Sequence, residues 1–304
     1  MSTLHIHEVG LRDGLQMERD VVPTEKKLGW LRRLVASGVG TIQVGSFVHP
    51  VKVPQMADTD RLFAALGAPG DRPAGVTLSA LVLNEKGLER ALACGVDLIC
   101  AGVSASETHS MKNTGMGTEE AARRIIAIAR RATAEGRRVQ LSVQSAFGCG
   151  YEGRVPPERV LAIAGRYLEA GMRNISLADT AGHATPAHVE ALFGALRGLD
   201  PQMETACHFH NTYGMGLANA WAAFRAGVTS FESSVAGMGG CPFTKIAGGN
   251  VCTEDLVHMF RAMGMCAGID LGALVAVAAD VAEFFSREMP GTVYRTGTID
   301  ARQD

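Results

Sequence analysis

Short segments rich in Val, Ile and Leu recur along the chain and alternate with longer amphipathic segments. Each apolar segment has the length of a buried β-strand, and most end in polar or small residues. They cover residues 4–10, 40–46, 75–83, 95–103, 137–146, 173–180, 204–211 and 229–237. Continuous apolar segments of this kind are typical of strands buried on both faces, as in a parallel sheet.

The segments between the predicted strands show the apolar spacing of helices. The clearest of them cover residues 24–37, 118–134, 157–170, 186–197 and 214–226. Several end in a glycine, as in "ASGVG", "EAGMR" and "RAGVT", and glycine is the residue favoured just after a helix. Eight strand–helix units predict a (β/α)8 TIM barrel, for which about 250 residues are typical.

We expect the barrel over about residues 4–265, followed by an additional C-terminal helix and a polar tail over about 266–304. The whole chain, residues 1–304, is then a single domain. A doubly wound open sheet is the alternative. It is disfavoured because the first strand–helix turn, "EVGLRDGLQ", lacks the GxGxxG fingerprint of dinucleotide-binding folds.

Composition excludes several classes of protein. The 304 residues carry a formal net charge of -2, and the most basic segment, "ARRIIAIARRATAEGRR", places its arginines on one face of a predicted helix, so nucleic acid is a poor partner. Seven scattered cysteines without a CxxC pair favour a reducing compartment. No apolar run approaches the roughly 20 residues that span a bilayer, and the first predicted strand begins by about Leu4, so we expect a cytoplasmic protein without a targeting segment.

Polar residues cluster where the predicted strands end, which is where barrel enzymes carry their active sites. The main candidates are Arg12 and Asp13, Gln43, Asp179, and the pair His208 and His210. Residues two apart on a strand project to the same side, so both histidines can point into the barrel. Together with an aspartate from the first strand they suit a divalent metal, although satisfied core histidines are the alternative.

The segment "SSVAGMGGCPFTKIAGGNVCTED" (residues 233–255) follows the last predicted strand and is dense in glycine. Long glycine-rich loops at this face of a barrel act as lids, and Cys241 becomes a candidate acid or nucleophile. A surface connection with an incidental cysteine is the alternative. In "ASETHSMKNTGMG" (105–117), Lys112 and Asn113 could meet phosphates near a helix start or belong to a solvated loop.

Several motifs resemble those of the 3-hydroxy-3-methylglutaryl-CoA lyase family, within the DRE-TIM metallolyases. They are "VGLRDGLQME", "GSFVHPVKVPQMAD", "GCGYEG", "SLADTAG", "HFHNTYGMGLAN" and "SSVAGMGGCPF…GGNVCTEDLV". The resemblance implies a (β/α)8 barrel that cleaves an acyl-CoA substrate by a retro-Claisen reaction and releases acetyl-CoA. It also implies a possible homodimer.

The resemblance further implies roles for individual residues. The metal, Mg²⁺ or Mn²⁺, would be held by Asp13, His208, His210 and Asn250. The substrate arginine would be Arg12, the mobile-loop cysteine Cys241, and Asp179 the aspartate of the sixth strand.

Two positions depart from the family pattern. Gln43 stands where the family usually has a glutamate, which leaves the site about one unit more positive, and Asn211 replaces an aspartate next to His210. These departures keep two further hypotheses open. One is a related metallolyase that acts on a different branched 3-hydroxyacyl-CoA or hydroxy acid, and the other is a metal-binding barrel with little catalysis.

Overall fold

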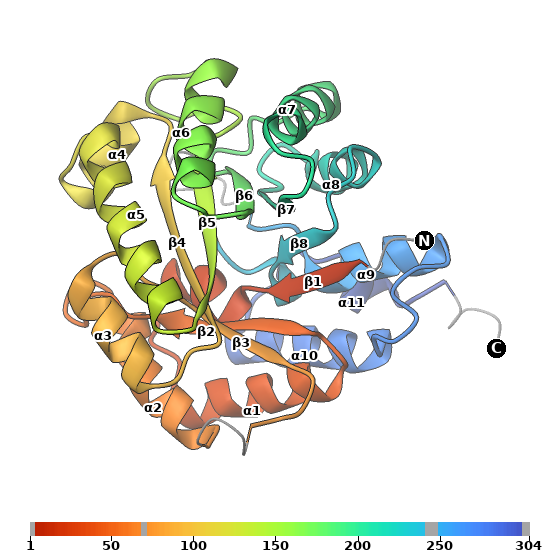
Figure 1. Ribbon diagram of the computed structural model, residues 1–304. Coiled ribbons are helices and arrows are strands. Elements are labelled where there is room, and N and C mark those ends of the chain that lie inside the picture. The colour runs from red at the N-terminus through yellow and green to blue at the C-terminus, as the bar shows by residue number, and fades with distance from the viewer. Residues whose placement is uncertain (1–3, 68–71, 241–248, 300–304) are drawn as a thin grey trace.

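Eight parallel strands close into a barrel in the computed structural model of the chain, which describes residues 4–67, 72–240 and 249–299. Each strand pairs with its sequence neighbour, and β1 pairs with β8 to complete the ring (Figure 1). The strands are β1 His5–Glu8, β2 Thr41–Ser46, β3 Thr77–Leu81, β4 Leu98–Ser104, β5 Arg138–Gln144, β6 Asn174–Asp179, β7 Glu204–Phe209 and β8 Ser230–Ser233. The predicted (β/α)8 fold is confirmed, and every predicted strand segment overlaps one observed strand.

Helices surround the barrel on its outer side (Figure 1). They are α1 Thr24–Ala36, α2 Thr59–Ala65, α3 Glu85–Ala93, α4 Glu107–Thr114, α5 Thr118–Ala134, α6 Pro157–Glu169, α7 Pro186–Leu199, α8 Gly216–Arg225, α9 Thr253–Ala262, α10 Leu271–Phe284 and α11 Val293–Thr296. Among the described helices, none is long and apolar enough to cross a membrane. The predicted cytoplasmic location stays a prediction.

The predicted additional helix after the barrel is present as α10, which packs against α1. Trp30 of α1 is buried, its ring lies edge-on to Phe284 at 5.5 Å between ring centres, and its indole Nε1 donates to Asp280 at 3.0 Å. Lys26 and Arg33 also pair with Asp280. Burial of large aromatic rings contributes more to this contact than its partly exposed ion pairs.

The barrel interior is unusually polar on its inward-facing positions. Along β5, Val139, Leu141 and Val143 alternate with Gln140, Ser142 and Gln144, and the last three line an internal cavity. Barrel interiors are ordinarily filled by layers of bulky branched side chains. Because small and polar residues replace those layers here, space remains at the centre for a ligand.

Candidate active site

A π-helical turn places Arg12 and Asp13 at the mouth of the barrel. The turn, Gly10–Gly14, follows β1 directly. A Cβ atom on Gly10 would lie 2.5 Å from the Glu8 carboxylate, and one on Gly14 would lie 2.8 Å from the Cβ atom of Met238, so neither position has space for a side chain. The glycines of "GLRDG" therefore let the turn pack tightly between β1 and the loop after β8, with its two functional side chains directed into the barrel.

Glu8 anchors this turn from below. Its Oε1 accepts hydrogen bonds from the Gly10 amide at 2.7 Å and the Val235 amide at 3.0 Å, and its Oε2 accepts from the Thr253 hydroxyl. Burial raises the pKa of Glu8 to about 7, against the opposing effect of these hydrogen bonds. The sequence analysis missed Glu8. A carboxylate inside an apolar strand is the signal that could have revealed it.

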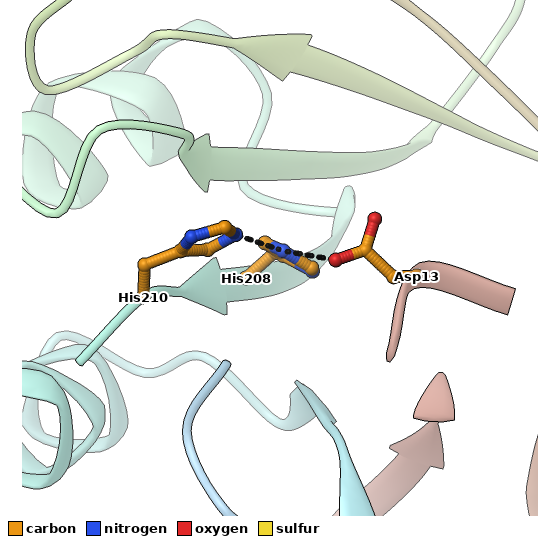
Figure 2. Close-up of side chains that lie close together, drawn as sticks. All are labelled: Asp13, His208 and His210. Carbon is orange, nitrogen blue, oxygen red and sulfur yellow. Dashed lines mark hydrogen bonds and ion pairs between the residues drawn. The ribbon is translucent and has the colours of Figure 1, made fainter. Parts of the chain in front are cut away.

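Asp13, His208 and His210 converge, and their candidate ligand atoms all lie within 4.8 Å of one another. The Nε2 atoms of the two histidines are 3.2 Å apart, and His208 Nε2 is 3.8 Å from Asp13 Oδ2. Figure 2 shows the two imidazoles coming from the end of β7 to face the carboxylate, which comes from the turn after β1. The structure thus brings together three of the four predicted metal ligands in one cluster.

Asn250, the fourth predicted ligand, lies against the same cluster. Its Nδ2 donates to Asp13 Oδ2 at 2.9 Å and to the Met238 carbonyl at 3.0 Å. Its Oδ1 is buried and has no hydrogen-bond partner among the described residues. A buried amide oxygen without a donor is costly unless something satisfies it, and a hard divalent cation does so. The residues therefore fit a divalent cation, which Asp13, His208, His210 and Asn250 would hold.

The charges around the cluster follow from burial and from the groups nearby. Burial alone would raise the pKa of Asp13, but Arg12 and the two histidines outweigh burial and hold that pKa well below its usual range. Burial and the neighbouring His208 lower the pKa of His210 to about 4, which keeps its imidazole neutral. An ionised carboxylate and a neutral imidazole are the forms that bind a metal ion.

Glu232 of β8 supports His208 from behind and was also missed by the sequence analysis. Its Oε2 accepts from His208 Nδ1 at 2.9 Å, and its Oε1 accepts from the Ser176 hydroxyl at 3.0 Å. Burial lowers the pKa of His208, but the bond to Glu232 and the charge of Asp13 outweigh that effect, so the pKa is raised overall. Such a carboxylate–histidine pair fixes the ring orientation and increases its basicity.

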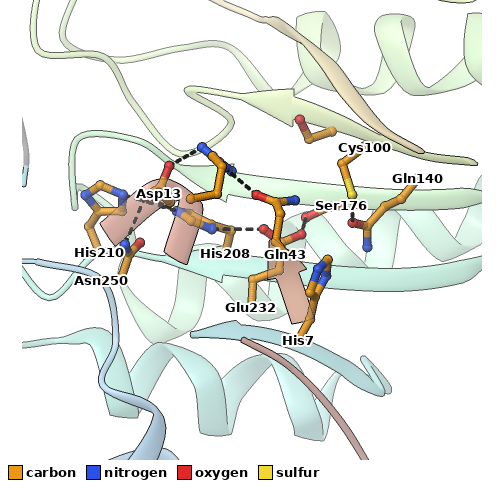
Figure 3. Close-up of polar contacts among 12 residues, drawn as sticks. His7, Asp13, Gln43, Cys100, Gln140, Ser176, His208, His210, Glu232 and Asn250 are labelled. Carbon is orange, nitrogen blue, oxygen red and sulfur yellow. Dashed lines mark hydrogen bonds and ion pairs between the residues drawn. The ribbon is translucent and has the colours of Figure 1, made fainter. Parts of the chain in front are cut away.

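Gln43 and Arg12, which are both predicted site residues, are in contact. Gln43 is 1% exposed, its Oε1 accepts from Arg12 Nε, and Arg12 Nη1 pairs with Asp13 Oδ1. Figure 3 labels Gln43 and Asp13, the two side chains that Arg12 contacts. The guanidinium is therefore held on two sides.

Asp179 lies apart from this cluster. It is 0% exposed, and its Oδ1 accepts from the backbone amides of His183 at 2.8 Å and Ala184 at 3.2 Å. Burial raises its pKa to about 7, although these amide bonds oppose that effect. Asp179 thus orders the loop between β6 and α7, and its predicted catalytic role stays a prediction.

The other predicted residues have different outcomes. Cys241 lies outside the described residues. The Oδ1 of Asn211 accepts from the Gly216 amide at 2.9 Å, so this side chain caps the start of α8 instead of supporting His210. Lys112 lies in the last turn of α4, with its Nζ 4.7 Å from the ring centre of Tyr151, whereas Asn113 lines the cavity.

A cavity of about 740 Å³ extends from the cluster into the barrel and out to the mouth. Arg12, Asp13, His208 and His210 line one part of it. Three basic residues also line it: His49 and Lys52 from the loop after β2, and Lys86 from the first turn of α3. The cavity is large enough for an acyl thioester, and the basic residues provide positive charge for phosphate groups.

A sequence model of the HMGL-like family matches residues 3–281. The chain belongs to the HMGL-like family. The hydroxymethylglutaryl-CoA lyase of Bacillus subtilis is 38% identical over 285 residues, which is 94% of each chain. The (R)-citramalyl-CoA lyase of Chloroflexus aurantiacus is 37% identical over 305 residues, which is 98% of this chain and 96% of that protein.

Solved structures of HMGL-like relatives have the same fold. An HMG-CoA lyase from Acinetobacter baumannii, in complex with coenzyme A and 3-methylmalate, superposes with a TM-score of 0.90 at 34% identity over 98% of this chain and 96% of that one. The Bacillus subtilis HMG-CoA lyase gives a TM-score of 0.92 at 36% identity over 97% and 98%. These relatives are named lyases, and HMGL-like proteins are a lyase family, so the prediction of a lyase is confirmed at that level.

Proposed function

We propose that this chain is a divalent-metal-dependent acyl-CoA lyase that cleaves 3-hydroxy-3-methylglutaryl-CoA, or a close analogue, to acetyl-CoA and a keto acid. With 3-hydroxy-3-methylglutaryl-CoA itself, the keto acid is acetoacetate. One observation carries the proposal. Four oxygen and nitrogen ligands, Asp13, His208, His210 and Asn250, gather beside the Arg12 guanidinium in a cavity of suitable size.

The reaction breaks the C2–C3 bond of the acyl chain. The 3-hydroxyl proton passes to a base, C3 becomes a ketone, and C2 leaves as the enolate of acetyl-CoA, which then takes up a proton. A bound divalent cation supplies positive charge that makes the substrate hydroxyl more acidic and orients it. Of the two candidate bases, Asp13 has a low pKa and suits a ligand, whereas Glu232 increases the basicity of His208.

Arg12 is placed to stabilise the enolate. Gln43 occupies its Nε and Asp13 its Nη1, which leaves Nη2 without a partner among the described residues. A fixed donor aimed at a developing negative charge typically contributes about 3 kcal/mol to the lowering of the barrier. We assign Nη2 to the thioester oxygen and Cys241 to the protonation of the enolate carbon.

The test is an HPLC assay of acetyl-CoA release from 3-hydroxy-3-methylglutaryl-CoA with Mg²⁺ or Mn²⁺, with EDTA, and with metal restored. We expect turnover that disappears on chelation and returns with metal. Calorimetric titration of Mn²⁺ into the EDTA-treated protein should give one site per chain. Metal binding without cleavage of any 3-hydroxyacyl-CoA tested would contradict the proposal.

A second candidate substrate is (R)-citramalyl-CoA. The lyase of that name matches this chain as closely as the hydroxymethylglutaryl-CoA lyases do, and Gln43 departs from their usual glutamate. The two thioesters should therefore be assayed together, for the wild type and for Gln43→Glu. If Gln43 selects between them, the variant shifts the ratio of kcat/KM toward 3-hydroxy-3-methylglutaryl-CoA, and an unchanged ratio would exclude Gln43 as the determinant.

A further inference from the structure

Gln140 presents an unused hydrogen-bond donor to the cavity. It lies on the inward face of β5, is 4% exposed and lines the cavity. Its Oε1 lies 3.6 Å from the Cys100 thiol. Among the described residues, no hydrogen-bond partner is found for its Nε2. The amide nitrogen is therefore a donor that a group in the cavity can engage.

The surroundings of Gln140 are polar but carry no net charge of their own. Cys100 and Ser142, which also line this part of the cavity, are uncharged, and burial raises the pKa of the Cys100 thiol to about 12. Figure 3 shows Cys100 and Gln140 together, on the far side of Gln43 from His210 and Asn250. The interior therefore contains a neutral polar subsite next to the charged groups of the site.

The position of this subsite relates it to one part of the substrate. This step rests on the proposed function. Carbon 3 of the acyl chain carries the reacting hydroxyl, the thioester arm, the carboxylate arm and a fourth substituent, which is methyl in 3-hydroxy-3-methylglutaryl-CoA. Arg12 and the metal ligands provide for the first three, so the fourth substituent is left to face the neutral subsite.

A methyl group would be a poor occupant of that subsite. It would cover the Gln140 amide N–H groups without accepting a hydrogen bond, and a buried donor left unpaired typically costs about 1–3 kcal/mol. We propose that Gln140 is a specificity-determining residue, and that the preferred substrate carries an oxygen-bearing fourth substituent, such as hydroxymethyl or carboxyl, that accepts a hydrogen bond from Gln140 Nε2. The bonds broken and formed are unchanged, and the keto acid released keeps this oxygen.

The experiment compares 3-hydroxy-3-methylglutaryl-CoA with two analogues whose methyl group is replaced by hydroxymethyl or by carboxyl. For the wild type, we expect kcat/KM to be at least about tenfold higher for one of the oxygen-bearing thioesters. Gln140→Met, which keeps the length and removes the donor, should abolish this preference. Gln202→Met is the matched control, because it makes the same change at an exposed position that does not line the cavity. It should leave the ratio between the thioesters unchanged.

Binding provides a readout that does not depend on turnover. Analogues in which hydrogen replaces the reacting hydroxyl cannot be cleaved, and their Kd values can be measured by calorimetry with and without chelator. The oxygen-bearing analogue should bind wild type more tightly than the methyl analogue, and Gln140→Met should remove the difference. If the variant fails to fold, the difference in Kd between the two analogues for the wild type still tests the inference.

The outcomes separate this inference from the proposed function. Cleavage of 3-hydroxy-3-methylglutaryl-CoA at least as fast as both analogues would overturn the assignment of Gln140 and leave the lyase function intact. An equal loss for all three thioesters in Gln140→Met, or the same loss of preference in Gln202→Met, would also overturn it. If the wild type cleaves none of the three, the lyase function itself fails, and this inference fails with it.

Discussion

Two halves of the same barrel interior are built on opposite principles. The charged half consists of Arg12, Asp13, His208, Glu232 and Asn250, and its members are joined to one another by ion pairs and hydrogen bonds. The neutral half consists of Cys100, Gln140, Ser142 and Gln144, on β4 and β5, where the side chains leave hydrogen-bonding capacity facing the cavity. The charged half is preorganised for one reaction, whereas the neutral half is open to whatever group the substrate brings.

The largest effect should come from removing charge at the centre of the charged half. Asp13→Asn removes the charge of a proposed metal ligand, which is also the partner of Arg12. Because a bound metal ion contributes several kcal/mol to transition-state stabilisation, we expect kcat to fall by about 10³-fold or more. The measurements are kcat and the Mn²⁺ stoichiometry from calorimetry. Retention of both metal binding and turnover would remove Asp13 from the site.

A substitution at Glu232, which contacts His208, should lower activity less than a substitution at Asp13 does. Glu232→Gln keeps the shape but weakens the support of His208 Nδ1, and we expect metal affinity or kcat/KM to fall by about 10–100-fold. Ser176→Ala is the control, since it removes a single neutral hydrogen bond to Glu232 and should cost less than tenfold. Equal effects of the two changes would mean that the Glu232 charge is unimportant.

Two buried carboxyl groups, those of Glu8 and of Glu254 in α9, predict that the free energy of unfolding depends on pH. Burial raises the pKa of Glu254 to about 8 and that of Glu8 to about 7. Since both folded-state values lie above the unfolded value of about 4.3, the folded state binds more protons in between. The contribution of these two groups to the free energy of unfolding should be highest below about pH 4.3. It should then fall by about 1.4 kcal/mol per pH unit for each group until its folded-state pKa is passed.

Glu254→Gln tests this prediction with a neutral group of the same shape. Urea unfolding between pH 5 and pH 8 should show a smaller loss of stability in the variant than in the wild type. Asp255→Asn is the control, because its neighbouring carboxylate lies at the surface and bonds to the amides of Thr292 and Val293. The same pH dependence in wild type and Glu254→Gln would contradict a protonated Glu254.

The smallest effect should come from the neutral half. Gln140→Met replaces an amide whose nitrogen has no partner among the described residues, so we expect the free energy of unfolding to change by less than about 1 kcal/mol. Thermal and urea unfolding measure this directly. A loss of several kcal/mol would show that Gln140 is a structural residue of the interior, and the contrast between the two halves would no longer hold.

The sequence predicted the fold and the charged half far better than the neutral half. Apolar periodicity placed all eight strands, and strand alternation directed His208 and His210 to the same side. Glu8 and Glu232 were missed because their partners, such as Thr253 and Ser176, are distant in sequence and only the closed ring brings them together. Asp179 ends its strand as an active-site residue would, yet the backbone amides of His183 and Ala184 hold it, which no sequence pattern indicates.

The closure of the barrel also bears on how the protein is made. Asn250 bonds to Asp13 across 237 positions of the chain, and β8 completes the ring beside β1 only after all other strands exist. A chain emerging from the ribosome therefore has no assembled metal cluster until nearly its whole barrel has been synthesised. The reactive centre and the complete fold become available at the same moment, so a truncated product would lack the chemistry altogether.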